Sequence, residues 1–245
     1  MKRTLLVGAT SAIGEHVARR LATSDSAMYL TGRDTARLNA IAGDLGVRGA
    51  GLVKTEQLDL SEEGGTRGLV SRAVETLGGL DTVIYAAGQL LDQANLNRES
   101  QRLHETMDVN AVSAMILLNE AGGFFEYQRH GQIVAIGSVA GDRGRASNYA
   151  YGAAKGALEI FMSGLRQRLS KSGVAVLLVK PGFVDTPMTA AFKKGPLWAT
   201  PDRIASDIVR AMQTGNRVIY TPWYWRWIML AIRLIPESIF TRLQL

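Results

Sequence analysis

The stretch of sequence that decides the fold runs from residue 4 to residue 14 and reads TLLVGATSAIG. Its first four residues predict a short buried strand, and the residues from Ala12 onward predict a helix. A glycine-rich turn between a strand and a helix directs backbone N–H groups and the helix N-terminus to one point, where a pyrophosphate can bind. The stretch therefore predicts a nucleotide-binding unit at the start of the chain.

The alternation of short strands and longer helices continues along the chain. We expect strands at residues 4–7, 28–31, 52–58, 82–86, 132–136, 174–180 and 218–220, and helices that begin near Ala12, Thr35, Glu62, Glu99, Ala146 and Pro201. Buried-type strands that alternate with helices predict a parallel, doubly wound sheet, with function at the carboxyl ends of the strands. The sequence thus predicts an α/β Rossmann fold with a seven-stranded parallel sheet, a catalytic domain over residues 1–221 and an apolar tail over residues 222–245.

Composition and charge exclude several classes of function. With 245 residues, 47% of them hydrophobic and 20% charged, the chain is typical of a globular protein. The absence of cysteine excludes disulfides, thiolate metal sites and thiol catalysis. His16, His104 and His130 are far apart, so no metal site is expected. The net charge of +6 favours phosphorylated ligands or an anionic membrane surface, and no motif indicates nucleic acid. The first residues lack a signal-peptide core, so we expect a cytoplasmic protein.

The segment YGAAK, residues 151–155, is the most informative for chemistry. Residues four apart on a helix share a face, which places the Lys155 ammonium near the Tyr151 phenol. A nearby positive charge would lower the phenol pKa from about 10 toward neutrality and make proton exchange possible. Tyr149 has Ala153 at the corresponding position and lacks such a partner. Tyr151 is therefore the candidate acid/base.

Ser138 ends a predicted strand, and Asn110 interrupts a long helical pattern. In order and spacing, Asn110, Ser138, Tyr151 and Lys155 resemble the tetrad of the short-chain dehydrogenase/reductase family. The resemblance implies that Ser138 holds the substrate oxygen and Tyr151 exchanges its proton. It also implies that Lys155 lowers the tyrosine pKa and binds the nicotinamide ribose, and that Asn110 holds a relay water.

The glycine turn resembles the nucleotide motif of the same family, with Ala12 in place of its middle glycine. The cofactor site implied by these resemblances consists of Gly8, Thr10, Ser11, Ile13, Gly14, Arg33, Asp59, Leu60, Ala87, Gly88, Asn110, Tyr151, Lys155, Pro181, Gly182, Val184 and Thr186. Within it Asp59 sits where the family contacts adenine, and Val184 and Thr186 where it contacts the nicotinamide carboxamide. Arg33 stands beside the position where an acidic residue would bind the ribose 2′-hydroxyl, and a guanidinium can pair with a 2′-phosphate. NADP(H) is therefore favoured over NAD(H), the alternative being that Arg33 stacks on adenine or caps a turn.

Residues 222–235 read PWYWRWIMLAIRLI and are too few to span a bilayer. Arg226 and Arg233 share one helical face, and tryptophans and aliphatic residues cover much of the remainder, as in a helix at a membrane surface. The alternative is a contact between subunits of a homodimer or homotetramer. Since the tail holds no group that hydride transfer needs, we expect it to affect access to the site and not its chemistry.

From Gly131 onward the chain resembles, within this family, the bacterial reductases of decaprenylphosphoryl-2-keto-erythro-pentose, at residues 131–134, 181–188 and 235–240. Lys193 and Lys194 are candidates to bind the phosphate of such a lipid, unless their loop is simply solvated. We therefore expect NAD(P)H-dependent reduction of a small-molecule or lipid-linked ketone. One alternative is a general ketone or 3-oxoacyl reductase. Another is a cofactor-sensing scaffold without turnover, although the intact tetrad argues against it.

Overall fold

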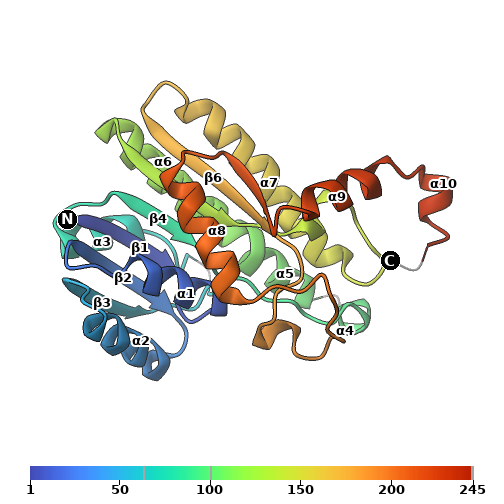
Figure 1. Ribbon diagram of the computed structural model, residues 1–245, viewed down its shortest axis with the longest axis horizontal. Helices are drawn as coiled ribbons and strands as arrows, with labels where there is room; N and C mark the ends of the chain where they lie inside the picture. Colours follow the sequence, from blue (N-terminus) through green and yellow to red (C-terminus); the bar gives the residue numbers. More distant parts are fainter. Residues whose placement is uncertain (63, 100, 244–245) are drawn as a thin grey trace.

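The computed structural model describes residues 1–62, 64–99 and 101–243, and Figure 1 shows the chain around its central sheet. Within these residues seven parallel strands form one sheet in the order β3-β2-β1-β4-β5-β6-β7. The strands are β1 (Lys2–Val7), β2 (Ser26–Gly32), β3 (Leu52–Gln57), β4 (Thr82–Tyr85), β5 (Gly131–Ile136), β6 (Val174–Pro181) and β7 (Val218–Thr221). The predicted Rossmann architecture is confirmed, with every predicted strand present.

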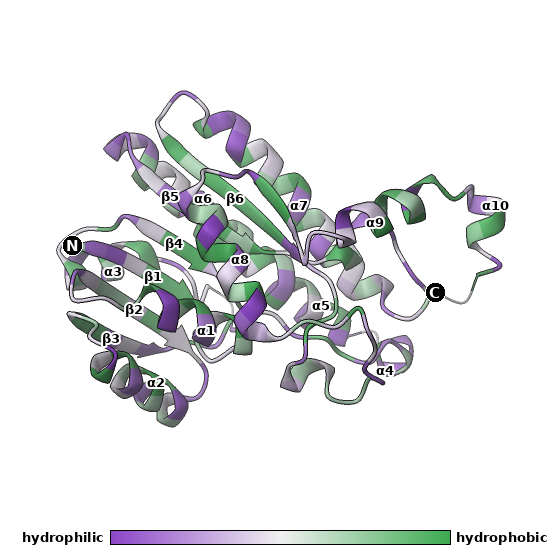
Figure 2. Ribbon diagram, in the orientation of Figure 1, coloured by the Kyte–Doolittle hydropathy of each residue, from purple (hydrophilic) through white to green (hydrophobic). Residues whose placement is uncertain are grey.

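Helices cover both faces of the sheet. Three of them, α1 (Ala12–Leu21), α2 (Thr35–Val47) and α8 (Pro201–Gln213), pack on one face. The other face is covered by α3 (Leu69–Leu77), α6 (Ser113–Gln128) and α7 (Tyr149–Leu169). Successive strand residues point to opposite faces, so Leu5 and Leu6 enter different core clusters. Figure 2 shows the resulting apolar strands in the middle of the molecule. This core fixes the carboxyl ends of the strands, where the loops gather.

Several helices differ from their predicted bounds. The helix expected near Glu62 begins at Leu69, because Gly64 and Gly68 adopt left-handed backbone conformations, with φ of 76° and 66°, that interrupt a helix. Two short helices, α4 (Gln93–Arg98) and α5 (Arg102–Met107), stand where one was expected to begin near Glu99. A π-helical turn (Asp108–Val112) then joins α5 to α6. Such turns are frequent at functional sites, and this one contains Asn110.

The C-terminal tail contains α9 (Trp225–Leu234) and α10 (Glu237–Phe240), which lie at the right of Figure 1 beyond the end of the sheet. Trp225 and Met229 are buried on the inner side of α9 and pack with Val139. The Arg143 guanidinium donates to the carbonyl oxygens of Ile232 and Ile235, each at 2.6 Å. The inner side of the tail is therefore attached to the catalytic domain. Among the residues described, no helix has the length and apolarity that crossing a membrane requires.

Candidate active site

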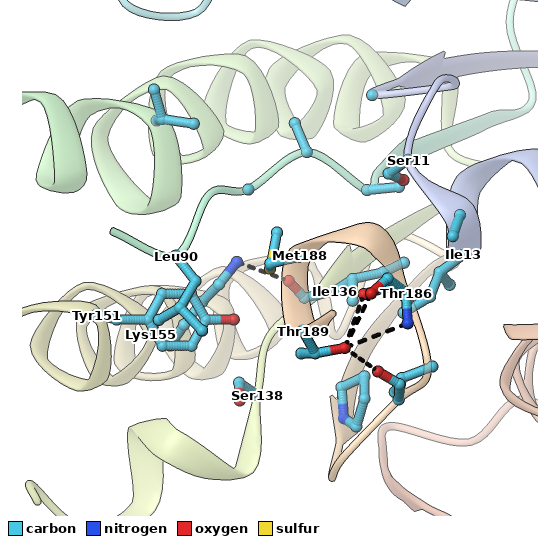
Figure 3. Close-up of a pocket in the computed structure, with 18 of the residues that line it drawn as sticks. Ser11, Ile13, Leu90, Ile136, Ser138, Tyr151, Lys155, Thr186, Met188 and Thr189 are labelled. Carbon is cyan, nitrogen blue, oxygen red and sulfur yellow. Dashed lines mark hydrogen bonds between the residues drawn. The ribbon is translucent and has the colours of Figure 1, made fainter. Parts of the chain in front are cut away.

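A cavity of about 640 Å³ opens where the strands end. Its walls come from the turn after β1, the ends of β2, β4, β5 and β6, and the first turns of α7, and Figure 3 shows part of this lining. The residues predicted from sequence that line it are Gly8, Thr10, Ser11, Ile13, Arg33, Asp59, Leu60, Ala87, Gly88, Ser138, Tyr151, Lys155, Pro181, Gly182, Val184 and Thr186. Two predicted residues, Gly14 and Asn110, lie behind this lining.

The glycine turn is closely packed against the loop that follows β4. Gly8 has a φ of 81°, and a Cβ added there would lie 2.5 Å from the backbone nitrogen of Ala87. A Cβ at Gly14 would lie 2.6 Å from the carbonyl oxygen of Gly8. The Gly14 N–H donates to the hydroxyl of Ser11, which caps α1. The glycines therefore leave a bare backbone cradle at the N-terminus of α1, of the kind that a pyrophosphate occupies.

Two guanidinium groups line the cavity beyond this cradle. Arg33 follows β2, and Arg37 lies in the first turn of α2, where it pairs with Glu15 at 3.1 Å. Arg37 was not predicted from the sequence. Backbone and hydroxyl hydrogen bonds from Ser61 hold the pKa of Asp59 below its usual value. The cradle fits the pyrophosphate of a dinucleotide, and the two cations lie beyond it.

Tyr151 and Lys155 lie in the first turns of α7 and face the cavity (Figure 3). The Lys155 Nζ lies 5.7 Å from the centre of the Tyr151 ring and donates to the carbonyl oxygen of Ile136 at 3.1 Å. Burial lowers the pKa of Lys155 to about 8. It raises the pKa of Tyr151 to about 12, although the neighbouring Ser138 hydroxyl acts in the opposite direction.

Burial of the phenol dominates its pKa in this structure, and the expectation that Lys155 lowers that pKa stays a prediction. The Lys155 ammonium donates to a backbone carbonyl, and desolvation is the largest influence on the pKa of the Tyr151 phenol. Tyr151 is therefore held in its protonated form. Tyr149 differs from Tyr151 as the sequence predicts. The Tyr149 hydroxyl donates to Asn97 at 2.7 Å, and its side chain is half-exposed.

Asn110 is fully buried in the π-helical turn. Its Nδ2 donates to the carbonyl oxygens of Gln89 at 2.9 Å and Thr106 at 3.0 Å, and its Oδ1 accepts from the Gln89 N–H at 3.1 Å. A Cβ added at Gly88 would lie 3.0 Å from that Oδ1 and 3.4 Å from the Nζ of Lys155. Asn110 therefore fixes the loop that separates it from the lysine, and its role with a water stays a prediction.

The loop after β6 is braced by its own side chains and by the tail. Thr189 donates its hydroxyl to the carbonyl oxygen of Val184 at 2.6 Å (Figure 3). A Cβ added at Gly182 would lie 1.9 Å from the Trp225 indole nitrogen, and the Phe183 and Trp225 rings stand 5.2 Å apart. Trp225 therefore supports a wall of the cavity, and the expectation that the tail affects access and not chemistry stays a prediction.

The substrate end of the cavity contains residues that the sequence did not single out. Its apolar wall includes Leu90, Val139, Phe183, Met188 and Phe192. Arg145 and Asn148, on the loop before α7, add polar groups. In contrast, Lys194, a candidate from sequence, pairs with Asp185 at 2.6 Å. Over the described part of the chain, no cluster of His, Asp or Glu could hold a metal ion.

Comparison with known proteins places the chain in a family. The short chain dehydrogenase family matches residues 2–196. The chain is 34% identical over 239 residues to the uncharacterized oxidoreductase Rv2073c of Mycobacterium tuberculosis, covering 98% of this chain and 96% of the relative. It is also 34% identical over 248 residues to an uncharacterized oxidoreductase of Streptomyces coelicolor, with the same coverage of 98% and 96%.

Solved structures share the fold. A short-chain dehydrogenase from Sphingobium yanoikuyae in complex with NADPH matches with a TM-score of 0.84 at 24% identity, covering 97% of this chain and 98% of that one. Actinorhodin polyketide ketoreductase with NADPH matches with a TM-score of 0.81 at 21% identity, covering 91% and 97%. Together with the family match and the full-length relatives, this establishes that the chain belongs to the short-chain dehydrogenase/reductase family of NAD(P)-dependent oxidoreductases.

Proposed function

We propose that the protein reduces a ketone to a secondary alcohol with NADPH. One observation carries the proposal: a single cavity holds the backbone cradle at Gly8 at one end and Ser138, Tyr151 and Lys155 at the other. The cofactor would lie between them, with the 2′-phosphate against Arg33 and Arg37. Bound NADPH would supply a hydride to the carbonyl carbon. The fold shared with actinorhodin polyketide ketoreductase is compatible with this activity.

The protein's own residues supply the proton. Ser138 donates a hydrogen bond to the carbonyl oxygen, and Tyr151 transfers its phenolic proton to the same atom. A pKa of about 12 keeps the phenol protonated and available as an acid throughout the neutral range. Lys155 is charged below pH 8 and stabilises the phenolate left after the transfer. Asn110 acts by positioning the backbone of Gln89 at the edge of the site.

The lipid-linked keto-pentose is the most specific substrate that we propose. The apolar wall supports a substrate with an extended hydrocarbon part, and the same wall also fits a general ketone or acyl-chain substrate. A screen should therefore follow NADPH oxidation with a polyprenyl-phosphoryl keto-pentose, a 3-oxoacyl thioester and simple aryl ketones. Turnover of simple ketones alone would favour the general reductase. No ketone-dependent oxidation with any compound would reject the proposed activity.

We also propose that the outer side of the tail contacts an anionic membrane, at the inner face of the cytoplasmic membrane. Trp227, Leu230 and Leu234 recur at helical spacing on α9 and are exposed, opposite the buried Trp225 and Met229.

The charge of the tail favours lipid over a second copy of the chain. Arg226, Arg233 and Arg242 are exposed, whereas Glu237 pairs with Arg143 at 2.8 Å. Two such faces brought together by a two-fold axis would oppose like charges. The homodimer or homotetramer expected from the sequence stays a prediction.

Sedimentation with vesicles tests the membrane contact. The protein should bind phosphatidylcholine vesicles that contain phosphatidylglycerol, and a variant with Trp227→Ser and Leu234→Ser should lose binding while it keeps its oligomeric mass. A change of mass with unchanged vesicle binding would assign the surface to a subunit contact.

A further inference from the structure

Arg145 lies in the substrate end of the cavity, on the loop between β5 and α7. Its Nε is buried and has no hydrogen-bond partner among the described residues. Its Nη2 makes one contact, with the sulfur of Met229 at 3.4 Å, and a thioether is a weak acceptor. A buried guanidinium normally has a carboxylate or several carbonyl partners, because an unpaired buried charge is costly. The charge of Asp142 raises the pKa of Arg145, but burial has the larger effect and lowers it, and no carboxylate among the described residues hydrogen-bonds to the guanidinium.

The nearest carboxylate is already engaged. The side chain of Asp142, three residues earlier, is fully buried and forms an ion pair with Lys180, and it also accepts a hydrogen bond from the Tyr220 hydroxyl at 2.9 Å. Among the described lining residues Asp59 is the one acidic group, and it belongs to the nucleotide end. The neighbouring Arg143 differs from Arg145, because its guanidinium donates hydrogen bonds to backbone carbonyls of the tail and to Glu237. The substrate end thus has a cation and no anion of its own.

Asn148 adds a second polar group to the same wall. Its side-chain oxygen is buried without a hydrogen-bond partner among the described residues, and the residue lines the cavity. Two unsatisfied polar atoms from one loop indicate a polar ligand, since buried polar groups in native structures are nearly always hydrogen-bonded. The apolar wall formed by Leu90 and Phe192 completes a pocket that is apolar on one side and cationic on the other.

We propose that Arg145 binds a carboxylate or phosphate group of the substrate and thereby selects ketones that carry a negative charge. The inference rests on the proposed ketone reduction and narrows its substrate class. A guanidinium can form two parallel hydrogen bonds to either anion, so the chemistry is shared by soluble acids and by phosphate esters. Arg145 acts as a specificity residue, whereas Ser138 and Tyr151 act on the carbonyl oxygen.

Matched ketones test the proposal with the full chain and NADPH. The pair 4-acetylbenzoate and 4-acetylbenzamide differs in charge but hardly in shape, and 4-acetylphenyl phosphate with 4-acetylanisole provides the phosphate arm. The wild type should prefer the charged member of at least one pair, and the arm that responds identifies the anion. Arg145→Gln should lower the charged-to-neutral ratio of kcat/KM about 10- to 100-fold, the value of hydrogen bonds to a charged group. Arg145→Lys should restore part of that ratio.

Controls separate this result from general effects. Arg210→Gln removes the same charge from an exposed position on α8 outside the cavity lining and should leave the ratio unchanged. A loss by Arg145→Gln that is equal for charged and neutral ketones would overturn the proposal and assign a structural role. A wild type without preference for either anion would also overturn it.

Binding of a non-reducible acid keeps the inference separate from the proposed activity. Calorimetric titrations of 4-isopropylbenzoate and 4-isopropylphenyl phosphate in the presence of NADP⁺ should give, for at least one of the two anions, a weaker affinity in Arg145→Gln than in the wild type by the same factor. If no ketone were reduced but this difference persisted, the proposed function would fail and the anion site would stand. Equal affinities of the two proteins for both anions would reject the site.

Discussion

Replacement of Tyr151 by phenylalanine removes one hydroxyl from the wall of the cavity and leaves the ring in place. The pKa of the phenol is about 12, so the phenol is protonated at neutral pH. It can therefore give its proton to the alkoxide that forms when hydride reaches the carbonyl carbon. Ser138 can still hold the carbonyl oxygen but lies at the end of β5 without a base beside it, and its hydroxyl already accepts the Ala140 N–H at 3.1 Å. Loss of a positioned general acid costs about 10²- to 10⁴-fold.

We therefore expect Tyr151→Phe to lower kcat/KM about 1000-fold, which corresponds to about 4 kcal/mol of transition-state stabilisation. NADPH binding should change little, because the backbone cradle and the arginines are untouched. Steady-state rates of NADPH oxidation with a ketone, and cofactor binding followed by fluorescence, measure the two quantities separately.

The matched control is Tyr149→Phe. That hydroxyl bonds to Asn97 at 2.7 Å and its side chain is 49% exposed, so its loss should reduce kcat/KM by less than about threefold. Equal losses in the two variants, or a Tyr151→Phe enzyme within tenfold of the wild type, would refute the assignment of the acid.

Three further predictions concern the cofactor, the lysine and the tail. Arg33→Ala should weaken NADPH binding about tenfold or more and NADH binding far less, since a charge-assisted pair with the 2′-phosphate is lost; an unchanged NADPH/NADH affinity ratio in titrations would return Arg33 to stacking or capping. The pKa of Lys155 is lowered to about 8, so the ammonium loses its proton as pH rises through that value while Tyr151 stays protonated. The kcat/KM for reduction should accordingly be level below pH 8 and fall above it, and a profile level to pH 10 would contradict the role of the charge. Trp225→Ala should lower the free energy of unfolding by about 3–5 kcal/mol because the indole is 2% exposed. Trp227→Ala, at 59% exposure, should change it by about 0.5 kcal/mol or less in the same denaturation experiment, and similar losses would show that the tail does not pack as described.

Much of the fold follows from local sequence. The β-branched runs and the turn at Gly8 suffice to place the strands. Buried parallel strands require runs of apolar residues, and a tight turn requires glycine, so both are visible in the local sequence. The start of α3 was misplaced because an apolar pattern does not reveal the left-handed conformations of Gly64 and Gly68. The π-helical turn was visible only as a polar interruption at Asn110.

The site was predictable where chemistry sets the spacing between residues. Tyr151 and Lys155 are neighbours on one helix face, so their separation of four residues in the sequence was enough to predict that they lie together. Their pKa shifts could not be predicted, because burial and the hydrogen bond to Ile136 depend on tertiary structure. The role of Arg145 could not be predicted from the sequence, because it is inferred from hydrogen-bond partners that its side chain lacks in the folded chain. The packing of Trp225 on the loop after β6 likewise joins distant segments.

Transfer of deuterium from cofactor to product tests the central claim most directly. The protein would be incubated with NADPH deuterated at the transferable C4 position and a ketone from the screen, and the alcohol analysed by mass spectrometry and NMR. One deuterium should appear on the former carbonyl carbon, from one face of the cofactor, and this product should be nearly absent with Tyr151→Phe. An alcohol without deuterium at that carbon, or labelled product formed equally well by Tyr151→Phe, would contradict the account.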